Sequence, residues 1–433
     1  MKVSLTTLGC KQNQYESDAL LEILEGAGFK VKPAGERADV CLINTCTVTA
    51  KADLESRQLI RRAIRENPDA MVVVTGCYAQ VSPQVIAEIP GVDLVLGNPE
   101  KSHILSYLKE TRKRSLPQIQ VGDVSLISSF DTLKVQHSHR TRAFLKVQDG
   151  CDYSCSFCIV PKARGRSRSQ DPGVIMEQVR ALAASGHQEI VLTGVHLGSY
   201  GRDLIPPLSL TGLIKRLLIE PNIGRLRLSS LDPHEVEDGL VRLIQHSSRL
   251  CRHLHIPLQS GDDRILRLMR RAYNAKNFQK LVMDLASAIP DLAIGADVIV
   301  GFPQETEEGF ANTYFLLKGL PLAYLHVFCY SRREGTEAAG MLGQVPSNIK
   351  AERSQALREL GKRKSLEFRN RFIGRTLWVV TLSTRDRERG LLRGLTDNYI
   401  EVLFSGDDSL KGRIVPVEIT RVLGDTTFAR LAG

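Results

Sequence analysis

The sequence predicts an α/β protein built from three parts. Short, continuously apolar segments alternate with helical patterns over residues 1–110, and the alternation restarts at residue 141 and runs to residue 346. Strands that are apolar on both faces are typical of parallel sheets covered by helices. Residues 374–433 instead contain five short strand-like segments separated by turns. We therefore expect an N-terminal parallel sheet, a central partial (β/α)6 barrel of the TIM type and a small C-terminal β-barrel of the OB type.

The N-terminal part is predicted to bring three cysteines to one edge of its sheet. Its expected strands cover residues 3–8, 40–43, 71–74 and 94–96, and its helices cover residues 17–27 and 52–66. Cys10, Cys46 and Cys77 each follow the end of a strand. Because the carboxyl ends of parallel strands share one edge, we expect these thiols to converge as a metal site. The alternative is three buried structural thiols, which is also our interpretation of Cys41 in mid-strand.

The central part opens on three cysteines within eight residues, Cys151, Cys155 and Cys158. Three thiolates on one loop can hold three irons of a cubane cluster and leave the fourth iron open to a cofactor. A structural zinc site would need four ligands in paired spacings, and no cysteine or histidine follows in the twenty residues after Cys158. The spacing resembles the signature of the radical S-adenosylmethionine (SAM) enzymes, in which SAM chelates the open iron. Three incidental thiols are the alternative.

Six strand–helix repeats are expected in the central part, fewer than the eight of a closed TIM barrel. The predicted strands cover residues 143–147, 190–192, 226–228, 254–256, 293–300 and 324–328. The predicted helices cover residues 174–185, 213–219, 236–244, 278–288 and 310–318. Chemistry is expected at the carboxyl ends of the strands, the first of which leads into the cysteine loop.

Polar residues at those strand ends, with the aromatic residue before the third cysteine, are candidates for contacts with SAM. They are Phe157, Thr193, Gly194, Ser229, His255, Gln259 and Asp297. Each polar residue taken alone is equally well explained as a loop cap or a satisfied polar group of the core.

Basic residues are concentrated in segments outside the predicted sheets. Candidate RNA-binding residues are Lys162, Arg164, Arg166 and Arg168 after the cysteine loop, and Arg393 and Arg413 in the C-terminal barrel. The first four are alternatively ligands of the SAM carboxylate, or part of a solvated loop. Residues 111–140 are interpreted as a polar connector and residues 347–373 as a basic helical linker with a solvated face. A basic OB-like barrel after such a linker favours an RNA partner.

Length and composition are typical of a multidomain globular protein. The chain has 433 residues, a net charge of +10 and a pI of about 9.2, which favours a polyanionic partner. Nine scattered cysteines do not form a secreted disulfide framework and indicate metal or catalytic use in a reducing compartment. The N-terminus turns polar too early for a signal peptide, and no run of eighteen apolar residues occurs. We therefore expect a cytoplasmic protein without a membrane span.

The order of the three parts resembles the radical SAM methylthiotransferases over essentially the whole chain, and their C-terminal barrel is called a TRAM domain. By this resemblance Cys10, Cys46 and Cys77 ligate an auxiliary [4Fe-4S] cluster, whereas Cys151, Cys155 and Cys158 ligate the SAM-binding one. The resemblance implies that one SAM yields a 5′-deoxyadenosyl radical, that a second SAM supplies the methyl group, and that the auxiliary cluster carries the sulfur. It also implies an electron donor and a sulfur source, neither of which the sequence identifies.

Two segments resemble the branch of this family that acts on N6-threonylcarbamoyladenosine. They are residues 44–58 and residues 193–201. The implied reaction adds a methylthio group to C2 of this nucleoside at position 37, in the anticodon stem-loop of tRNA. The family alternatives are an isopentenyladenosine enzyme and a modifier of a ribosomal-protein aspartate. Outside the family, an RNA-binding Fe–S electron carrier or sensor and a structural zinc protein stay open.

Overall fold

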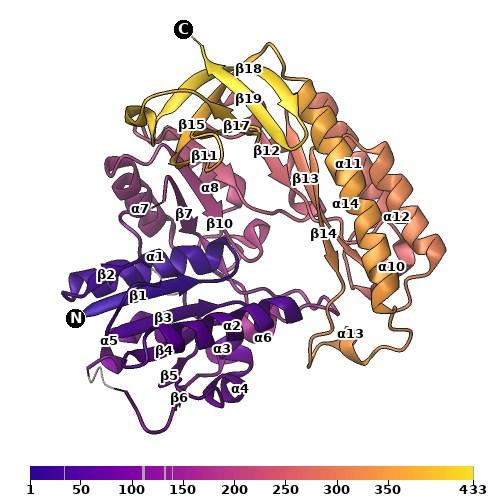
Figure 1. The fold of residues 1–433 in the computed structure, drawn as a ribbon. Coiled ribbons are helices and arrows are strands. Elements are labelled where there is room, and N and C mark those ends of the chain that lie inside the picture. The colour runs from indigo at the N-terminus through magenta and orange to yellow at the C-terminus, as the bar shows by residue number, and fades with distance from the viewer. Residues whose placement is uncertain (34, 110–112, 131–132, 139, 433) are drawn as a thin grey trace.

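The computed structural model describes residues 1–33, 35–109, 113–130, 133–138 and 140–432. Its three successive parts confirm the predicted α/β class and the closed C-terminal barrel (Figure 1). In Figure 1 the N-terminal sheet lies at the lower left, the C-terminal barrel lies at the top, and the central strands lie between them. Helix α14 (Ser347–Asn370) runs along the opposite side of the molecule from the N-terminal sheet.

The N-terminal sheet has six parallel strands in the order β2-β1-β3-β4-β5-β6. The strands are β1 Lys2–Thr7, β2 Lys30–Lys32, β3 Val40–Thr45, β4 Met71–Gly76, β5 Leu94–Leu96 and β6 Gln118–Gln120. The helices are α1 Lys11–Gly26, α2 Ala50–Glu66, α3 Cys77–Val81, α4 Pro83–Ala87 and α5 Ile104–Tyr107, with 3-10 helices η1 Pro99–His103 and η2 Val124–Leu126. The prediction missed β2 and β6 because three-residue edge strands carry little pattern.

Strand β6 lies inside residues 111–140, a segment whose polar composition predicts a connector. The pairing of Ile119 with Val95 joins this segment to the N-terminal sheet. Residues 110–112, 131–132 and 139 lie outside the described residues. The sheet therefore extends further along the chain than predicted.

Helix α1 belongs to two hydrophobic cores at once. Leu20 and Leu24 are fully buried in the core of the N-terminal sheet. Tyr15 and Ala19 are fully buried in the core of the central part, which also contains the strand β7 (Arg142–Lys146). Each buried apolar side chain contributes roughly 1.5–3 kcal/mol. The helix thereby holds the N-terminal sheet against the first strand of the central part.

The central part is a partial barrel of six parallel strands, as predicted. The sheets β11-β10-β7 and β12-β13-β14 are joined by parallel bridges between Leu226 and Leu250 and between Ser230 and His255. The other strands are β10 Glu189–Thr193, β11 Arg225–Leu228, β12 His253–His255, β13 Ala293–Val300 and β14 Tyr324–Cys329. A small hairpin pairs β8 Gln148–Asp149 with β9 Arg168–Ser169. Among the described strands, β7 and β14 are the two outer strands and do not pair, so the barrel is open between them.

Helices follow the strands of the partial barrel at the predicted places. The long ones are α7 Pro172–Ala184, α8 Leu210–Ile219, α9 Asp238–His246, α11 Ala275–Ala288 and α12 Glu307–Gly319. Shorter ones are α6 Val160–Arg164, α10 Asp263–Leu268 and α13 Glu337–Gly340, with 3-10 helices η3 Leu197–Ser199 and η4 Pro233–Glu235. Several begin with a side chain that accepts a hydrogen bond from the first turn. Asp171 does so for α7 and Thr306 for α12.

Helix α14 is more than the solvated linker that its charge pattern indicated. Leu357 and Leu360 are buried in the core of the central part. Arg353 Nη1 lies 2.7 Å from Glu305 Oε2, and Lys364 Nζ donates to the carbonyl of Leu320 at 2.6 Å. Arg369 is also buried, so these three basic residues support packing and do not belong to a solvated face.

The C-terminal part is a closed barrel with the strand order β15-β16-β17-β19-β18. Its strands are β15 Thr376–Arg385, β16 Leu392–Thr396, β17 Glu401–Phe404, β18 Ile414–Leu423 and β19 Thr426–Leu431, with the 3-10 helix η5 Asp408–Leu410. Pairing of β15 with β18 closes the barrel around Val379, Val402 and Phe404. Among the described residues, no helix combines the length and apolar character that crossing a membrane requires.

Candidate functional site

The three N-terminal cysteines converge at one edge of the sheet, as the strand pattern predicted. Cys10 caps the start of α1, Cys46 follows β3, and Cys77 is the first residue of α3, directly after β4. Strands β1, β3 and β4 are neighbours and parallel, so their carboxyl ends meet. Burial raises the pKa of the Cys46 thiol to about 12, and the nearby Cys77 and Cys10 act in the same direction. The three sulfurs thus lie within electrostatic reach of one another.

Two glycines allow the three cysteine loops to approach so closely. Gly9 has φ +119°, and a Cβ on it would lie 2.9 Å from Cys46 Cβ. Gly76 has φ +99°, and a Cβ on it would lie 2.3 Å from the carbonyl oxygen of Thr45. Glycine is the residue that adopts such a backbone conformation without steric cost. The close packing of the neighbouring loops therefore requires glycine at positions 9 and 76.

Replacing Gly76 with alanine is expected to disrupt this edge of the sheet. The left-handed backbone alone costs about 1–3 kcal/mol for an alanine, and the overlap with Thr45 adds to it. Gly374→Ala is the matched control, since Gly374 has φ +79° but no atom within 4 Å of an added Cβ. Iron content and thermal unfolding measure the result. Equal behaviour of the two variants would contradict the role assigned to Gly76.

Arg164 lies buried beside the N-terminal cysteines. Its guanidinium donates to Glu16 Oε1 at 2.6 Å, to Asp149 Oδ1 at 3.1 Å and to Asn13 Oδ1 at 2.8 Å. Burial opposes its charge, but Cys77 and the two carboxylates outweigh burial and hold the pKa of Arg164 well above its usual value. A permanent positive charge here fits a negatively charged cluster of thiolates.

This geometry corrects part of the predicted RNA-binding segment. Arg164 and Arg168 are buried, with 3% and 7% of their surface exposed, and Arg168 donates to the carbonyls of Arg166 and Arg164. Neither side chain is able to reach RNA, so the prediction is wrong for both. Lys162 and Arg166 are exposed, and Arg166 pairs with Asp152 at 3.4 Å. The sequence does not predict the burial of Arg164, because its partner Glu16 is 148 residues away in the chain.

The second cysteine set lies on the loop between β8 and α6. Arg271 Nη1 donates to Cys155 Sγ at 3.2 Å, and its other terminal nitrogen pairs with Asp232. The amide of Tyr153 donates to Cys151 Sγ at 3.4 Å. Burial raises the pKa of Cys158 to about 12, and Cys155 and Cys151 add to the shift. The cysteine spacing predicted this cluster of thiols, whereas Arg271 follows α10 in an ordinary basic segment and was missed.

A histidine–glutamate pair lies beside Cys151. His196 Nε2 lies 2.6 Å from Glu235 Oε1, and the Tyr153 ring packs on His196 with centroids 4.3 Å apart. Burial lowers the pKa of His196, but its contacts with Cys151 and Glu235 outweigh burial and raise it to about 9. His196 therefore adds positive charge beside the second cysteine set, as Arg271 does.

A cavity of about 210 Å³ is lined by residues from both cysteine loops. Val48 and Thr49, from the loop after Cys46, form one side, and Phe157, next to Cys158, belongs to the other. Its remaining lining consists of Gln259, Asp297, Ile299, Phe328, Cys329, Tyr330 and Ser331. Arg333, in the segment after β14, ties this segment to the N-terminal part, because it lies 2.7 Å from Asp53 and also donates to Thr47. Residues that neighbour Cys46 and Cys158 in the chain thus line one common cavity.

The predicted SAM contacts fall into two groups. Phe157, Gln259 and Asp297 line the cavity, and His255 Nε2 lies 2.9 Å from Asp297 Oδ1. The others, Thr193, Gly194 and Ser229, lie at the ends of β10 and β11, outside the lining of this cavity. Burial opposes the charge of Asp297, but His255 and His326 hold its pKa well below the usual value. Four of the predicted residues are therefore brought together.

A buried ion network lies at the amino ends of the strands β7, β10 and β11. We call Glu189, Arg142, Arg225 and Arg227 the Glu189 network. Glu189 lies 2.8 Å from Arg227 Nε and 2.7 Å from Arg225 Nε. Burial opposes its charge, but Arg227 and Arg225 hold the pKa of Glu189 far below its usual value. Both arginines also donate to C-terminal-barrel carbonyls, those of Leu395 and Thr396 at 2.7 and 2.8 Å. The network therefore docks that barrel.

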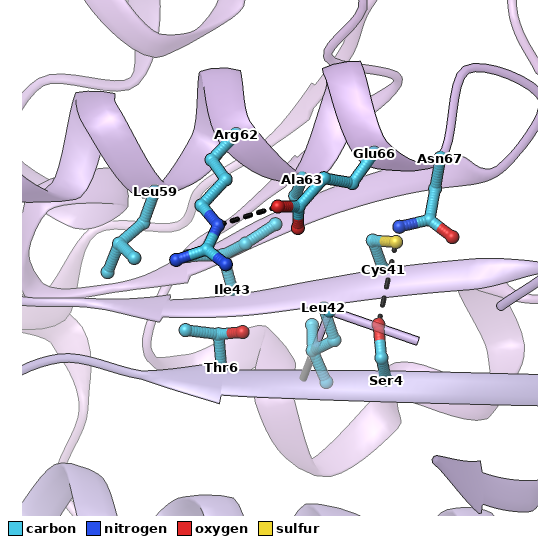
Figure 2. Close-up of a pocket in the computed structure, with 11 residues that line it drawn as sticks. Ser4, Thr6, Cys41, Leu42, Ile43, Leu59, Arg62, Ala63, Glu66 and Asn67 are labelled. Carbon is cyan, nitrogen blue, oxygen red and sulfur yellow. Dashed lines mark hydrogen bonds and ion pairs between the residues drawn. The ribbon is translucent and has the colours of Figure 1, made fainter. Parts of the chain in front are cut away.

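Cys41 is confirmed as a core residue, away from both thiol sets. It is 2% exposed and belongs to the core between β3 and α2. Figure 2 shows it at the edge of a small cavity beneath α2, where Ser4 Oγ lies 3.5 Å from Cys41 Sγ. Arg62 and Glu66 of α2 form an ion pair above this cavity of about 120 Å³. Among the described residues that line this cavity, Cys41 is the only cysteine.

Comparison with known proteins agrees with the two-part site. Residues 2–97 match the Uncharacterized protein family UPF0004, and residues 145–317 match the Radical SAM superfamily. A threonylcarbamoyladenosine tRNA methylthiotransferase, MtaB, of Bacillus subtilis is 41% identical over 423 residues, 97% of this chain and 94% of the relative. The chain belongs to the radical SAM methylthiotransferase family. It is an enzyme that transfers methylthio groups and uses SAM and [4Fe-4S] clusters.

Other methylthiotransferases are also similar over most of their length. The MtaB of Aquifex aeolicus is 41% identical and is covered completely, together with 97% of this chain. A tRNA-2-methylthio-N(6)-dimethylallyladenosine synthase of Moorella thermoacetica is 34% identical over 96% of this chain and 95% of its own length. The radical SAM methyltransferase TsrM of Kitasatospora setae shares the fold with a TM-score of 0.55 and 18% identity, over 78% of this chain and 77% of that one.

Proposed function

We propose that this methylthiotransferase adds a methylthio group to C2 of N6-threonylcarbamoyladenosine at position 37 of tRNA. The observation that carries the proposal is the pair of cysteine loops on either side of one cavity, in a chain 41% identical to two enzymes named for this nucleoside. The partner is the anticodon stem-loop. Because the substrate is tRNA, the proposal also assigns the enzyme to the cytoplasm.

We infer that Cys10, Cys46 and Cys77 hold one [4Fe-4S] cluster and that Cys151, Cys155 and Cys158 hold the other. Each set offers three thiols beside a buried cation, Arg164 for the first and Arg271 for the second. A cluster with three thiolate ligands keeps one open iron. When bound, the clusters and SAM supply the radical that abstracts the C2 hydrogen, and the sulfur that replaces it.

The residues of this chain position the groups and exclude water. Arg271 orients the Cys155 thiolate through a hydrogen bond that Asp232 holds in place. The cavity has apolar walls formed by Phe157, Ile299, Phe328 and Tyr330. Apolar walls keep water away from a radical and so protect it from side reactions. Gln259, Asp297 and His255 are the proposed polar contacts of SAM. Thr193, Gly194 and Ser229 stay predictions for the same role.

RNA contacts are proposed for exposed basic residues near the cavity and on the C-terminal barrel. Lys162 and Arg166 are exposed on the segment after the second cysteine set, and Arg413 is exposed on the barrel. Arg393 Nε lies 2.9 Å from Glu401 Oε1, so its charge is partly neutralised before any RNA binds. Exposed arginine and lysine side chains favour the phosphate backbone. An electron donor and a sulfur source complete the partners that the proposal requires.

Mass spectrometry of tRNA nucleosides from a deletion strain tests the proposal. We expect 2-methylthio-N6-threonylcarbamoyladenosine to disappear, its unmethylthiolated precursor to accumulate, and both changes to reverse when the gene is restored. Persistence of the product at normal levels would contradict the proposal. Loss of the dimethylallyl nucleoside instead would favour the second candidate, which the Moorella relative at 34% identity supports. Formation of 5′-deoxyadenosine by the reduced enzyme would exclude a noncatalytic electron carrier or sensor.

A further inference from the structure

Lys11 extends from the first cysteine set toward the partial barrel. It is the first residue of α1 and directly follows Cys10. Its side chain is half-buried and interacts electrostatically with Arg142, Arg227 and Glu189. Burial and nearby cations, Lys11 among them, lower the pKa of His253 at the start of β12. The amine therefore lies within electrostatic range of residues from four different strands of the barrel.

Positive charge exceeds negative charge around Lys11. Arg142, Arg225 and Arg227 share the single carboxylate of Glu189, and the latter two also have carbonyl partners in the C-terminal barrel. In the part of the chain that the structure describes, no hydrogen bond or ion pair engages the Lys11 amine. Three arginines thus contact one carboxylate, a fourth cation lies within electrostatic range of it, and most of this charge is shielded from water. Such an excess favours an anionic ligand at the one cation that lacks a partner.

We propose that Lys11 binds the carboxylate of the threonylcarbamoyl group and is a specificity-determining residue for this substrate. The inference rests on the proposed function. The threonylcarbamoyl substituent carries a carboxylate, whereas a dimethylallyl substituent carries no charge. In adenine only N1 and C6 separate C2 from the N6 nitrogen. Lys11 directly follows Cys10, so it lies beside the cluster that is proposed to deliver sulfur to C2, and the N6 substituent is only two ring atoms away from C2.

A phosphate of the tRNA backbone offers Lys11 the same anionic chemistry. The two sources differ in one testable respect. Every anticodon stem-loop has the phosphates, but only the threonylcarbamoylated one has the carboxylate. A phosphate contact would therefore strengthen binding of all stem-loops equally.

The test measures binding of synthetic anticodon stem-loops to the iron-reconstituted full-length enzyme in the presence of SAM. One stem-loop carries threonylcarbamoyladenosine at position 37, the second its methyl ester, and the third unmodified adenosine. We expect the wild-type enzyme to bind the acid roughly 10–100-fold more tightly than the ester, as a charge-assisted hydrogen bond implies. Lys11→Met should abolish this preference, and Lys11→Arg should keep most of it.

Lys51→Met is the matched control. Lys51 occupies the first turn of α2 as Lys11 occupies that of α1, but 82% of its side chain is exposed and its carboxylate partner is Glu55. This variant should keep the preference for the acid. Iron content and the absorption spectrum show whether each variant retains its clusters.

The outcomes separate this inference from the proposed function. Equal binding of acid and ester by the wild-type enzyme overturns the role of Lys11, even where Lys11→Met fails to fold. Equal weakening of all three stem-loops by Lys11→Met assigns the contact to phosphate and also overturns it. Unchanged preference in Lys11→Met, with methylthio product formed on the acid stem-loop, removes the inference alone. Absence of that product with the wild-type enzyme removes both.

Discussion

Replacing Cys46 with alanine is expected to abolish methylthio transfer while SAM cleavage continues. Cys46 belongs to the N-terminal sheet, whereas Cys151, Cys155 and Cys158 lie on a loop of the partial barrel. Two thiols are a poor ligand set for a cubane cluster, so iron should fall from about eight to about four per chain. The reduced variant should still form 5′-deoxyadenosine from SAM. Iron analysis and chromatography of the SAM products, both under anaerobic conditions, measure these effects.

Two further variants make this result specific. Cys41→Ala removes a thiol from the same sheet, but Cys41 faces the core beneath α2, so iron and transfer should be retained. Cys155→Ala should show the converse loss, with neither 5′-deoxyadenosine nor methylthio product. Retention of eight irons by Cys46→Ala would contradict the assignment of the first cysteine set.

Replacing Glu189 with glutamine is expected to destabilise the protein by about 3–5 kcal/mol. Glutamine keeps the shape of the side chain but leaves Arg142, Arg225 and Arg227 without a countercharge, and an unpaired buried charge costs this much. Urea unfolding followed by Trp378 fluorescence measures the effect. Trp378 is the only tryptophan, and its carbonyl accepts a hydrogen bond from Arg225 at 3.1 Å.

The loss of stability caused by Glu189→Gln should become smaller as the pH falls. The folded-state pKa of Glu189 is lowered relative to its unfolded value of about 4.5. The carboxylate therefore contributes its full stabilisation above that pH, and the contribution decreases as the pH falls below it. The difference between wild type and Glu189→Gln should narrow over this acidic range. Glu177→Gln is the control, because its side chain is 69% exposed. A difference that widens on acidification would contradict the network.

The sequence was sufficient for features that depend on local periodicity and chain order. The predicted bounds of β13, residues 293–300, match the structure at both ends, because an apolar run between turns leaves little choice. The convergence of Cys10, Cys46 and Cys77 followed from the rule that parallel strands end at one edge. Neither inference needed a contact between distant segments.

Long-range charge pairing was beyond the reach of the sequence. Arg164 looked like part of a basic surface loop, but its partner Glu16 is 148 residues away in the chain. Arg353, Lys364 and Arg369 looked like a solvated helix face, and they are buried by contacts with other helices and loops. Arg271 and the Glu189 network were missed for the same reason. Polar residues reveal their neighbours only when the fold is known.

Helix α1 contributes side chains to two hydrophobic cores, and this has a consequence for synthesis on the ribosome. Strand β6 ends at Gln120 and β7 begins at Arg142, so all six strands of the N-terminal sheet are synthesised before β7 exists. At typical translation rates this interval is on the order of a few seconds. During it, Tyr15 and Ala19 have no core to enter, and the edge bearing Cys10, Cys46 and Cys77 is not yet covered by Arg164. The nascent chain thus passes through a stage in which its first cysteine set is open to cluster-assembly factors.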